Sequence, residues 1–459
     1  MFNRLHQIRR WAGVDRPVFF VVVARGWSLF SGPVTVVLLG TFLNPESQGY
    51  YFTFGSVMAL QVFLELGFAQ AIIQFASHEF AQLRWAGDGT VTGHLPARSR
   101  LLSLGRLSLK AYAVMATLAP LLVGVAGQIF FQSRAQTGVN WLLPWWLLCL
   151  GSGANLLLLP VWSLLEGCNQ VEFVARCRLT MGIAGNIALW LALTLRAGLF
   201  AASASTGIAF LMGAYLLWRY RAPLLKQVVQ EKLTERMSWR REIWPFHWRM
   251  AVSGISGSIS SNLFNPTIFY FHGAIVAGQM GMTLSIVNSI SAVAMSWMST
   301  KAPRYGILIS QRRYVELDAL AWRATAQAFF VCLSGICVML CGLVWLKSGF
   351  VLGQRFATIP AAVFLSGTAL ISQVVYGQAY YLRAHKKEPF MWVSLMGSGL
   401  GAVAVIVGAR LFGPVGTSAA YLLAGVLVLP VTTWIFYKKR HLWHQESPAG
   451  IAGCQADPV

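Results

Sequence analysis

The hydrophobic residues of this chain come in blocks of about twenty, and the charged residues lie mostly in the gaps between the blocks. A helix of about twenty apolar residues spans the hydrocarbon core of a bilayer, which is roughly 30 Å thick. Stretches such as AAVFLSGTALISQVVYGQAYYL are apolar on every face and lack the alternation of a membrane β-strand. Only 11% of the residues are charged, against about 25% in soluble domains. The sequence therefore predicts an all-α integral membrane protein and excludes a soluble enzyme.

The apolar blocks predict about 12 transmembrane helices. Arg196 interrupts the apolar stretch of the fifth and sixth, so one long span in their place stays open as an alternative. The expected spans are Val18–Leu39, Tyr50–Ala76, Leu109–Phe131, Trp141–Leu165, Leu179–Leu195, Leu199–Trp218, Met250–Phe271, Ile275–Met298, Ala324–Leu346, Ala357–Leu382, Phe390–Arg410 and Val415–Tyr437.

The basic residues predict how the chain is oriented. Of the 36 Lys and Arg, 30 fall on one side of the predicted spans, and Arg25 lies within the first span. Basic loops stay in the cytoplasm, so both termini are expected there, with the apolar N-terminal segment retained as a span. The +21 balance thus reflects topology and contact with membrane lipids rather than binding to nucleic acid. The other side carries only Arg134, Arg196, Lys347, Arg355 and Arg410.

The predicted spans divide the chain into two halves. We expect a six-helix bundle over 1–218, a basic cytoplasmic linker over 219–249, a second six-helix bundle over 250–437 and a cytoplasmic tail over 438–459. The apolar residues of the linker have near-helical spacing, which indicates an amphipathic helix lying at the membrane surface. Gly49 and Gly278 occupy similar places at the start of the second and eighth spans, a weak sign of duplicated halves.

Several stretches resemble a known family. They are LGTFLNPESQGYYFTFGSVMALQVFLELGFAQAIIQFAS, NPTIFYFHGAIVAGQMGMTLSIVNSISAVAMSWMSTKAPRYG, YYLRAHKKEPF and LFGPVGTSAAYLLAGVLVLP. They resemble the polysaccharide and O-antigen flippases of the multidrug/oligosaccharidyl-lipid/polysaccharide exporter superfamily. The resemblance covers nearly the whole chain. These diffuse patterns of small, aromatic and turn residues specify the fold better than the cargo.

This resemblance implies two six-helix bundles around a central cavity that opens alternately to each side of the membrane. The implied cargo is a lipid-linked oligosaccharide or repeat unit on a polyprenyl phosphate or pyrophosphate, used to make O-antigen, capsule or exopolysaccharide. A polysaccharide polymerase and other export proteins are the implied partners. No cofactor is expected, and coupling to a proton or sodium gradient is an open alternative.

Arg25 and Glu65 are the ionisable residues placed well inside predicted spans, where an unpaired charge costs several kcal/mol. A guanidinium suits the oxygens of a phosphate, so Arg25 is a candidate phosphate anchor. Alternatively, it reaches the inner head groups or pairs with an acid. Glu65 is a candidate partner for Arg25 or a site for a coupling cation, and a purely structural pair is the competing interpretation.

Other polar residues in the spans are candidates for substrate binding. Gln61 and Gln70 flank Glu65 along the second span, where amides serve sugar hydroxyls or bind helix to helix. Pro266 is expected to free the carbonyl of Asn262 and to leave a polar bend in the seventh span. The candidates are Arg25, Gln61, Glu65, Gln70, Arg249, Asn262, Asn265 and Gln373; Arg249 serves equally as a positive-inside anchor.

Two other classes of function compete with a flippase. A glycosyltransferase, polymerase or ligase needs catalytic groups on an outer loop, but the predicted outer loops are short and contain one acid, Glu46. A cation-coupled multidrug exporter would favour several buried acids. The sequence has no Walker A motif, no metal-binding pair of His and no disulfide framework, so no catalytic or metal-binding residue is expected.

Reporter fusions test the predicted orientation. We expect fusions at both termini and near Arg240 to report a cytoplasmic location, because basic loops are retained on that side. Fusions beside Arg134 and Lys347 serve as the opposite control and should report the periplasm. A periplasmic signal near Arg240 would contradict the map of 12 spans.

Overall fold

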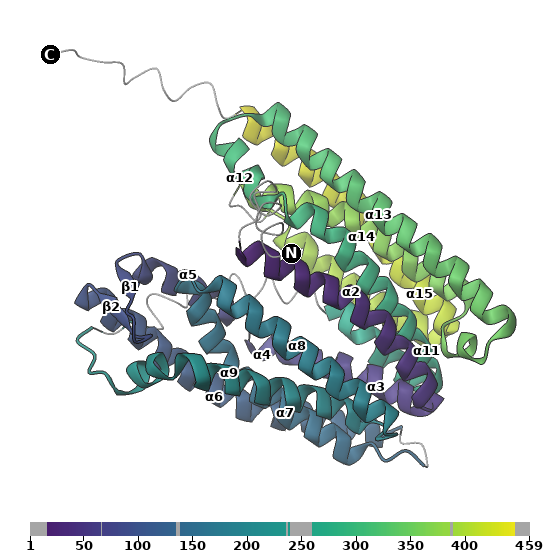
Figure 1. The fold of residues 1–459 in the computed structure, drawn as a ribbon. Helices are drawn as coiled ribbons and strands as arrows, with labels where there is room; N and C mark the ends of the chain where they lie inside the picture. Colours follow the sequence, from purple (N-terminus) through teal and green to yellow (C-terminus); the bar gives the residue numbers. More distant parts are fainter. Residues whose placement is uncertain are drawn as a thin grey trace, which may run out of the picture. The chain divides into compact units, whose positions relative to one another are not determined.

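A computed structural model describes residues 16–65, 67–134, 138–235, 237–238, 259–385 and 389–445. The chain forms two compact units, which are Met1–Ile255 with Gly273–Gly278 (unit 1) and Ser256–His272 with Gln279–Val459 (unit 2). The predictions made for 239–258, including Arg249, concern residues outside this described part of the chain. Figure 1 labels the helices and strands along the chain.

Unit 1 contains helices and one short β-hairpin. Its elements are α2 (Arg16–Phe42), α3 (Pro45–Met58), η1 (Ala59–Gln61), α4 (Val62–Glu65), α5 (Phe68–Phe80), β1 (Leu83–Trp85), β2 (Val91–Gly93), α6 (Leu95–Gln132), α7 (Leu142–Gly167), α8 (Val171–Thr194) and α9 (Phe200–Gln230). Helix α11 (Ile259–Ser299) leads into unit 2. It is followed by α12 (Ala302–Ser310), α13 (Tyr314–Gly349), η3 (Val351–Arg355), α14 (Ile359–Ala384) and α15 (Met391–Gln445).

Within the described ranges, eight helices are long and apolar enough to cross a membrane, and the bent pair formed by α3–α4 and α5 makes a ninth. Helices α11 and α15, with 41 and 55 residues, are about twice the length of one crossing. Each contains one residue with non-helical dihedral angles, Gly273 (φ 82°) and Gly413 (φ 71°). These two glycines lie where the sequence predicts the turns between the seventh and eighth spans and between the eleventh and twelfth. The all-α transmembrane fold is confirmed.

The fifth and sixth predicted spans are two helices. Helix α8 ends at Thr194 and α9 begins at Phe200, and the two helices pack along each other. Arg196 and Gly198 between them have positive φ angles of 57° and 59°. Left-handed residues end a helix and reverse the chain, which rules out one long span here.

A break in a transmembrane helix lies in the second span. The chain bends by 44° between α3–α4 and α5, at Gly67 with a φ of +74°. Helix α11 runs through Pro266 without a residue of non-helical angles there, and its break lies at Gly273, so a polar bend at Pro266 stays a prediction. Proline removes one hydrogen bond but its φ suits a helix, whereas glycine adopts the left-handed angles that end one.

Gly49 and Gly278 lie at one close helix–helix contact inside unit 1. A Cβ atom on Gly49 would be 1.9 Å from the carbonyl oxygen of Ala274, and one on Gly278 would be 2.8 Å from the amide nitrogen of Gly49. The side-chain amide of Gln48 donates to the carbonyl of Gly278 at 2.9 Å. This close approach is itself a sufficient physical reason for both glycines.

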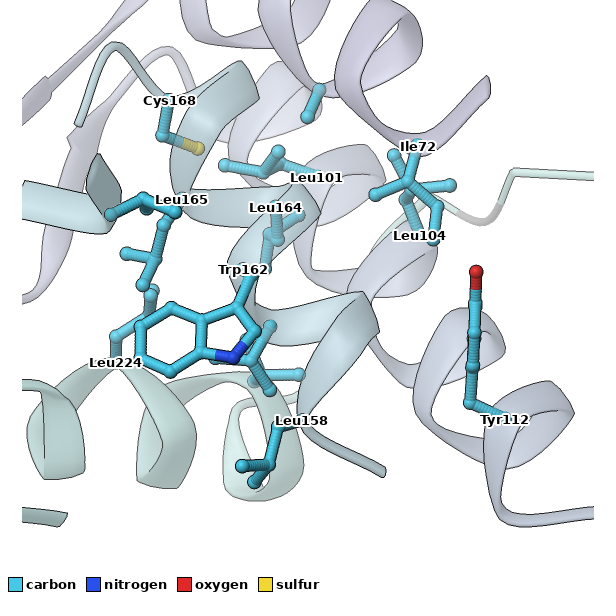
Figure 2. Packing of buried hydrophobic residues seen from close by; sticks show 14 of the residues in the cluster. Ile72, Leu101, Leu104, Tyr112, Leu158, Trp162, Leu164, Leu165, Cys168 and Leu224 are labelled. Carbon is cyan, nitrogen blue, oxygen red and sulfur yellow. The ribbon is translucent and has the colours of Figure 1, made fainter. Parts of the chain in front are cut away.

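The main core of unit 1 forms where α5, α6, α7 and α9 pack together (Figure 2). Ile72, Leu101, Trp162 and Leu224 bring one buried side chain from each of these helices. A second, aromatic cluster joins α3, α6 and α7, with the rings of Phe54 and Phe131 5.0 Å apart. These contacts fix the helices that carry the polar residues of this unit.

The first part of the linker predicted over 219–249 continues α9, which runs on to Gln230. Residues 239–249 lie outside the described part of the chain, so the amphipathic surface helix stays a prediction. Leu224 and Val228 are buried in the core of unit 1, and Arg106 of α6 donates to the carbonyl of Val228. The amide of Gln227 bonds to both backbone groups of Val91 in the hairpin, at 2.8 and 2.9 Å. Part of the apolar face of this stretch is therefore covered by protein, while Val229 stays 63% exposed.

Unit 2 is held together at one end by a polar network. Tyr381 of α14 donates its hydroxyl hydrogen to Asp318 of α13 at 2.7 Å, and Arg440 of α15 donates to the other carboxylate oxygen at 3.1 Å. His444 lies 2.8 Å from the Tyr381 hydroxyl and stacks on Tyr314. The single carboxylate thus joins the ends of three helices.

Two glycine substitutions test the packing of unit 1. A Cβ atom on Gly153 would lie 2.4 Å from Pro120 and 2.7 Å from the carbonyl of Ala116, whereas one on Gly182 meets nothing within 4 Å. We expect Gly153→Ala to lower the free energy of unfolding by about 1–3 kcal/mol, and Gly182→Ala to raise it slightly through helix propensity. Thermal unfolding in detergent measures both, and an equal shift in the two variants would contradict the packing.

Candidate functional site

Glu65 is held by a tyrosine on the neighbouring helix. It is the last residue of α4, next to the break at Gly67, and its carboxylate accepts a hydrogen bond from the Tyr112 hydroxyl at 3.1 Å. Tyr112 is fully buried and stacks on Phe68, with the ring centres 5.5 Å apart. The bend thus places a half-buried acid where packing fixes its hydrogen-bond donor.

The amides of the second span divide at the same break. Gln61 lies before it, and its side-chain oxygen accepts a hydrogen bond from the Ser152 hydroxyl of α7 at 3.0 Å. Gln70 lies after the break on α5 and is exposed. The predicted polar face of this span is therefore not one continuous stripe, because the chain changes direction between Glu65 and Phe68.

The substrate-binding roles of Arg25 and Arg249 stay predictions. Arg25 belongs to α2, but its side chain is outside the described atoms, as is the whole of Arg249. Helix α2 packs along α8, where Trp190 donates to the Thr35 hydroxyl at 2.9 Å. The described hydrogen-bond donor to Glu65 is Tyr112, so an Arg25–Glu65 pair stays a prediction.

A pocket of about 330 Å³ in unit 2 is lined by hydroxyl, amide and phenol groups among apolar side chains. It lies between the two segments of α11, α14 and α15. Among the described residues that line it, none is charged. They are Ser261, Phe264, Leu284, Val287, Asn288, Ser291, Leu365, Thr368, Ala369, Ser372, Tyr376 and Tyr421.

Three predicted site residues lie on the helices that form this pocket. Gln373 is fully buried, and its amide donates to the carbonyl of the pocket residue Ser291 at 3.4 Å. Asn262 is half-buried and follows Ser261 on α11, and Asn265 is buried one turn further on. The side-chain oxygens of Gln373 and Asn265 accept no hydrogen bond within the described part of the chain. Such buried acceptors are uncommon and require an explanation.

Most of the pocket residues were missed when the sequence was read alone. The sequence feature that could have found them is helical spacing, which places these residues on one face of each helix. Leu365, Thr368, Ser372 and Tyr376 follow one another at intervals of three or four along α14, and Leu284, Asn288 and Ser291 do so along α11. Small hydroxyl residues also bind helices together in membranes, so this spacing alone does not reveal a pocket.

The pocket can bind neutral polar groups. Hydroxyls and amides both donate and accept hydrogen bonds, as the hydroxyls of a sugar do. In unit 1, Glu65 adds one acid beside an aromatic wall. No group of three His, Cys, Asp or Glu residues that could hold a metal ion occurs within the portion of the chain that the structure covers.

The fold is similar to that of solved membrane transporters. The inward-facing conformation of a multidrug resistance MATE family transporter of the MOP superfamily matches with a TM-score of 0.65 and 13% identity, over 92% of this chain and 96% of that one. Lipid II flippase MurJ, in an inward closed conformation, matches with a TM-score of 0.60 and 13% identity, over 93% and 90%.

MATE in complex with MaL6 is a further match, with a TM-score of 0.58 and 13% identity. It covers 94% of this chain and 97% of that one. No family model matches the sequence, and no curated protein matches it significantly. The chain therefore has the fold shared by these MATE transporters and the lipid II flippase.

Proposed function

We propose that this protein is a flippase that moves a lipid-linked oligosaccharide or polysaccharide repeat unit across the bacterial inner membrane by alternating access. Its role would be in making O-antigen, capsule or exopolysaccharide. The fold that it shares with lipid II flippase MurJ over 93% of the chain supports such a transporter. The chemistry of the pocket in unit 2 supports a glycan as the cargo.

The observation that carries this proposal is the uncharged, hydroxyl-lined pocket. Its lining includes Asn288, Ser291, Thr368, Ser372 and Tyr376, which can exchange hydrogen bonds with a neutral sugar. The buried acceptor oxygens of Gln373 and Asn265 lie on the same helices. Polar groups without charge bind sugar hydroxyls at a lower desolvation cost than ionised groups would incur in the membrane.

A phosphate on the lipid carrier would need a cation. Arg25 lies about 10 Å along the first predicted span, and Arg249 enters the seventh predicted span at its inner edge. Guanidinium groups bind phosphate through two parallel hydrogen bonds. We therefore assign to Arg25 the role of phosphate anchor, with Arg249 as a second contact.

The second candidate function is a cation-coupled multidrug exporter, which the likeness to MATE transporters favours. A cationic drug needs carboxylates within the membrane. Glu65 is the single acid inside the predicted spans, and it accepts a hydrogen bond from Tyr112. One such acid suits a coupling proton or sodium ion better than it suits a series of bulky cations.

A membrane glycosyltransferase, polymerase or ligase is the third alternative. Catalysis on a sugar needs positioned acids or bases near the bond that breaks. From residue 250 onward, the acids all lie outside the predicted spans on the side predicted to be cytoplasmic; they are Glu316, Asp318, Glu388, Glu446 and Asp457. This arrangement disfavours chemistry at the outer face.

A strain that lacks the gene tests the proposed function. We expect it to accumulate the lipid-linked repeat unit and to lose surface polymer, because a flippase acts after assembly and before polymerisation.

Thr368→Leu, at matched protein level, should lower polymer export about three- to tenfold, since losing a hydrogen bond costs about 0.5–1.5 kcal/mol.

Thr180→Leu is the matched control for Thr368→Leu. Thr180 is exposed on α8, and its hydroxyl bonds to a carbonyl four residues back, as that of Thr368 does. The control should export normally.

Normal polymer in the deletion strain, combined with new sensitivity to cationic drugs, would reject the flippase in favour of the exporter.

Substitution of Arg25 separates a phosphate anchor from a structural charge. If Arg25 holds a phosphate, Arg25→Lys should restore only part of the transport and Arg25→Ala should restore less, because an ammonium lacks the planar fork. If Arg25 instead pairs with Glu65, each single alanine variant should lower the yield of folded protein, and the double variant should recover it. Normal transport by Arg25→Ala at matched protein level rejects the anchor.

A further inference from the structure

Unit 2 contains a second hollow of a different chemistry, an apolar groove of about 510 Å³ between α11 and α13. Ile286 and Ile290 line it from α11, and Val338, Gly342 and Leu346 line it from α13. The two hydroxyl groups in its wall already donate to backbone carbonyls, Thr283 to Gln279 and Ser334 to Phe330. The groove therefore offers hydrocarbon contacts to a ligand.

The shape of the groove is set by two glycines on one helix. At Gly335 the helices approach closely, since a Cβ there would lie 2.7 Å from Ile290. Two turns further along α13, a Cβ on Gly342 would meet nothing within 4 Å. The groove is thus narrow at Gly335 and wide at Gly342. Val338 between them is 74% exposed, so the groove is open at its side.

The wide end of the groove is closed by an ordered loop. Phe356, which is buried, lines this end and follows the η3 turn. The next amide, of Ala357, donates to the Thr283 hydroxyl at 3.0 Å, and the Gln279 side chain donates to the carbonyl of Gln354 at 2.8 Å. These bonds attach the loop to α11 and keep the end of the groove in shape.

A cation lies at this end. Lys347 is exposed, and its ammonium group donates to the carbonyl of the groove residue Phe356 at 3.3 Å. The aromatic rings of Trp345 and Phe350, close to Lys347 in the sequence, lie 4.7 Å apart and are exposed, as is typical of the membrane interface. Lys347 is one of five basic residues on the side predicted to face outward.

We propose that this groove binds the isoprenoid chain of a polyprenyl phosphate on the outward side of the membrane, with the phosphate at Lys347. The inference rests on the proposed function and identifies where the lipid carrier is held next to the outer surface. A single groove suits one chain rather than the two of a phospholipid. The width at Gly342 accommodates methyl branches, and the ammonium complements the phosphate.

Photolabelling with a diazirine-bearing polyprenyl phosphate tests the proposal on the purified full-length protein in nanodiscs. Gly342→Phe fills the groove. Gly399→Phe is the matched control, because a Cβ on Gly399 of α15 also meets nothing within 4 Å and lies outside the groove. Lys347→Gln removes the cation, and Lys347→Arg keeps it.

We expect Gly342→Phe to reduce labelling of α11 and α13 about tenfold, with Gly399→Phe unchanged. Lys347→Gln should weaken labelling and Lys347→Arg should preserve it. This second pair of variants tests the proposal even if Gly342→Phe does not fold. Unchanged labelling in Gly342→Phe, or displacement of the probe by phosphatidylglycerol as readily as by polyprenyl phosphate, overturns the proposal. Binding is measured without transport, so failure of the proposed function appears separately, as normal polymer in the deletion strain.

Discussion

The structure depends on the need to satisfy every backbone hydrogen bond within the hydrocarbon of the bilayer. An N–H or C=O group left unpaired there costs several kcal/mol, so each crossing must be a helix. Departures from α-helix are correspondingly few in the described spans: the 3-10 turn Ala59–Gln61 and glycines with left-handed angles. Gly67, Gly273 and Gly413 all have positive φ angles, which a residue with a Cβ atom rarely adopts. The first of them creates the bend beside Glu65, and the other two separate consecutive crossings.

The same constraint makes polar side chains within the spans informative. In unit 1, the hydrogen bonds from Tyr112 to Glu65 and from Ser152 to Gln61 satisfy polar groups that packing has buried. In unit 2, the oxygen of Gln373 is buried without a donor among the described residues, near a pocket of hydroxyl groups. A satisfied group of this kind binds helices together. The proposed function rests instead on the lining of the pocket itself, where the hydroxyls of Thr368 and Ser372 can also accept hydrogen bonds from a ligand.

Two hollows of unit 2 suit the two parts of an amphipathic lipid-linked glycan. The pocket at Thr368 and Ser372 offers hydrogen bonds, and the groove at Gly342 offers hydrocarbon contacts with Lys347 at its end. Both use the second segment of α11 as one wall, with Ser291 in the pocket and Ile290 in the groove. Adjacent residues on a helix point in directions about 100° apart, so one helix contributes a polar and an apolar wall at the same depth.

The fold class can be predicted from the residues alone, because block length and charge placement follow from bilayer thickness and from the cost of moving charge into hydrocarbon. The sequence also located Glu65 and Gln373 as polar residues in spans. Packing was needed to show that α9 continues past Trp218 as part of the core, that the second span bends at Gly67, and that Ser291 meets Thr368 and Ser372 at one pocket. Helical spacing gives the face of a helix on which a residue lies, but the neighbour of that face depends on packing between distant segments.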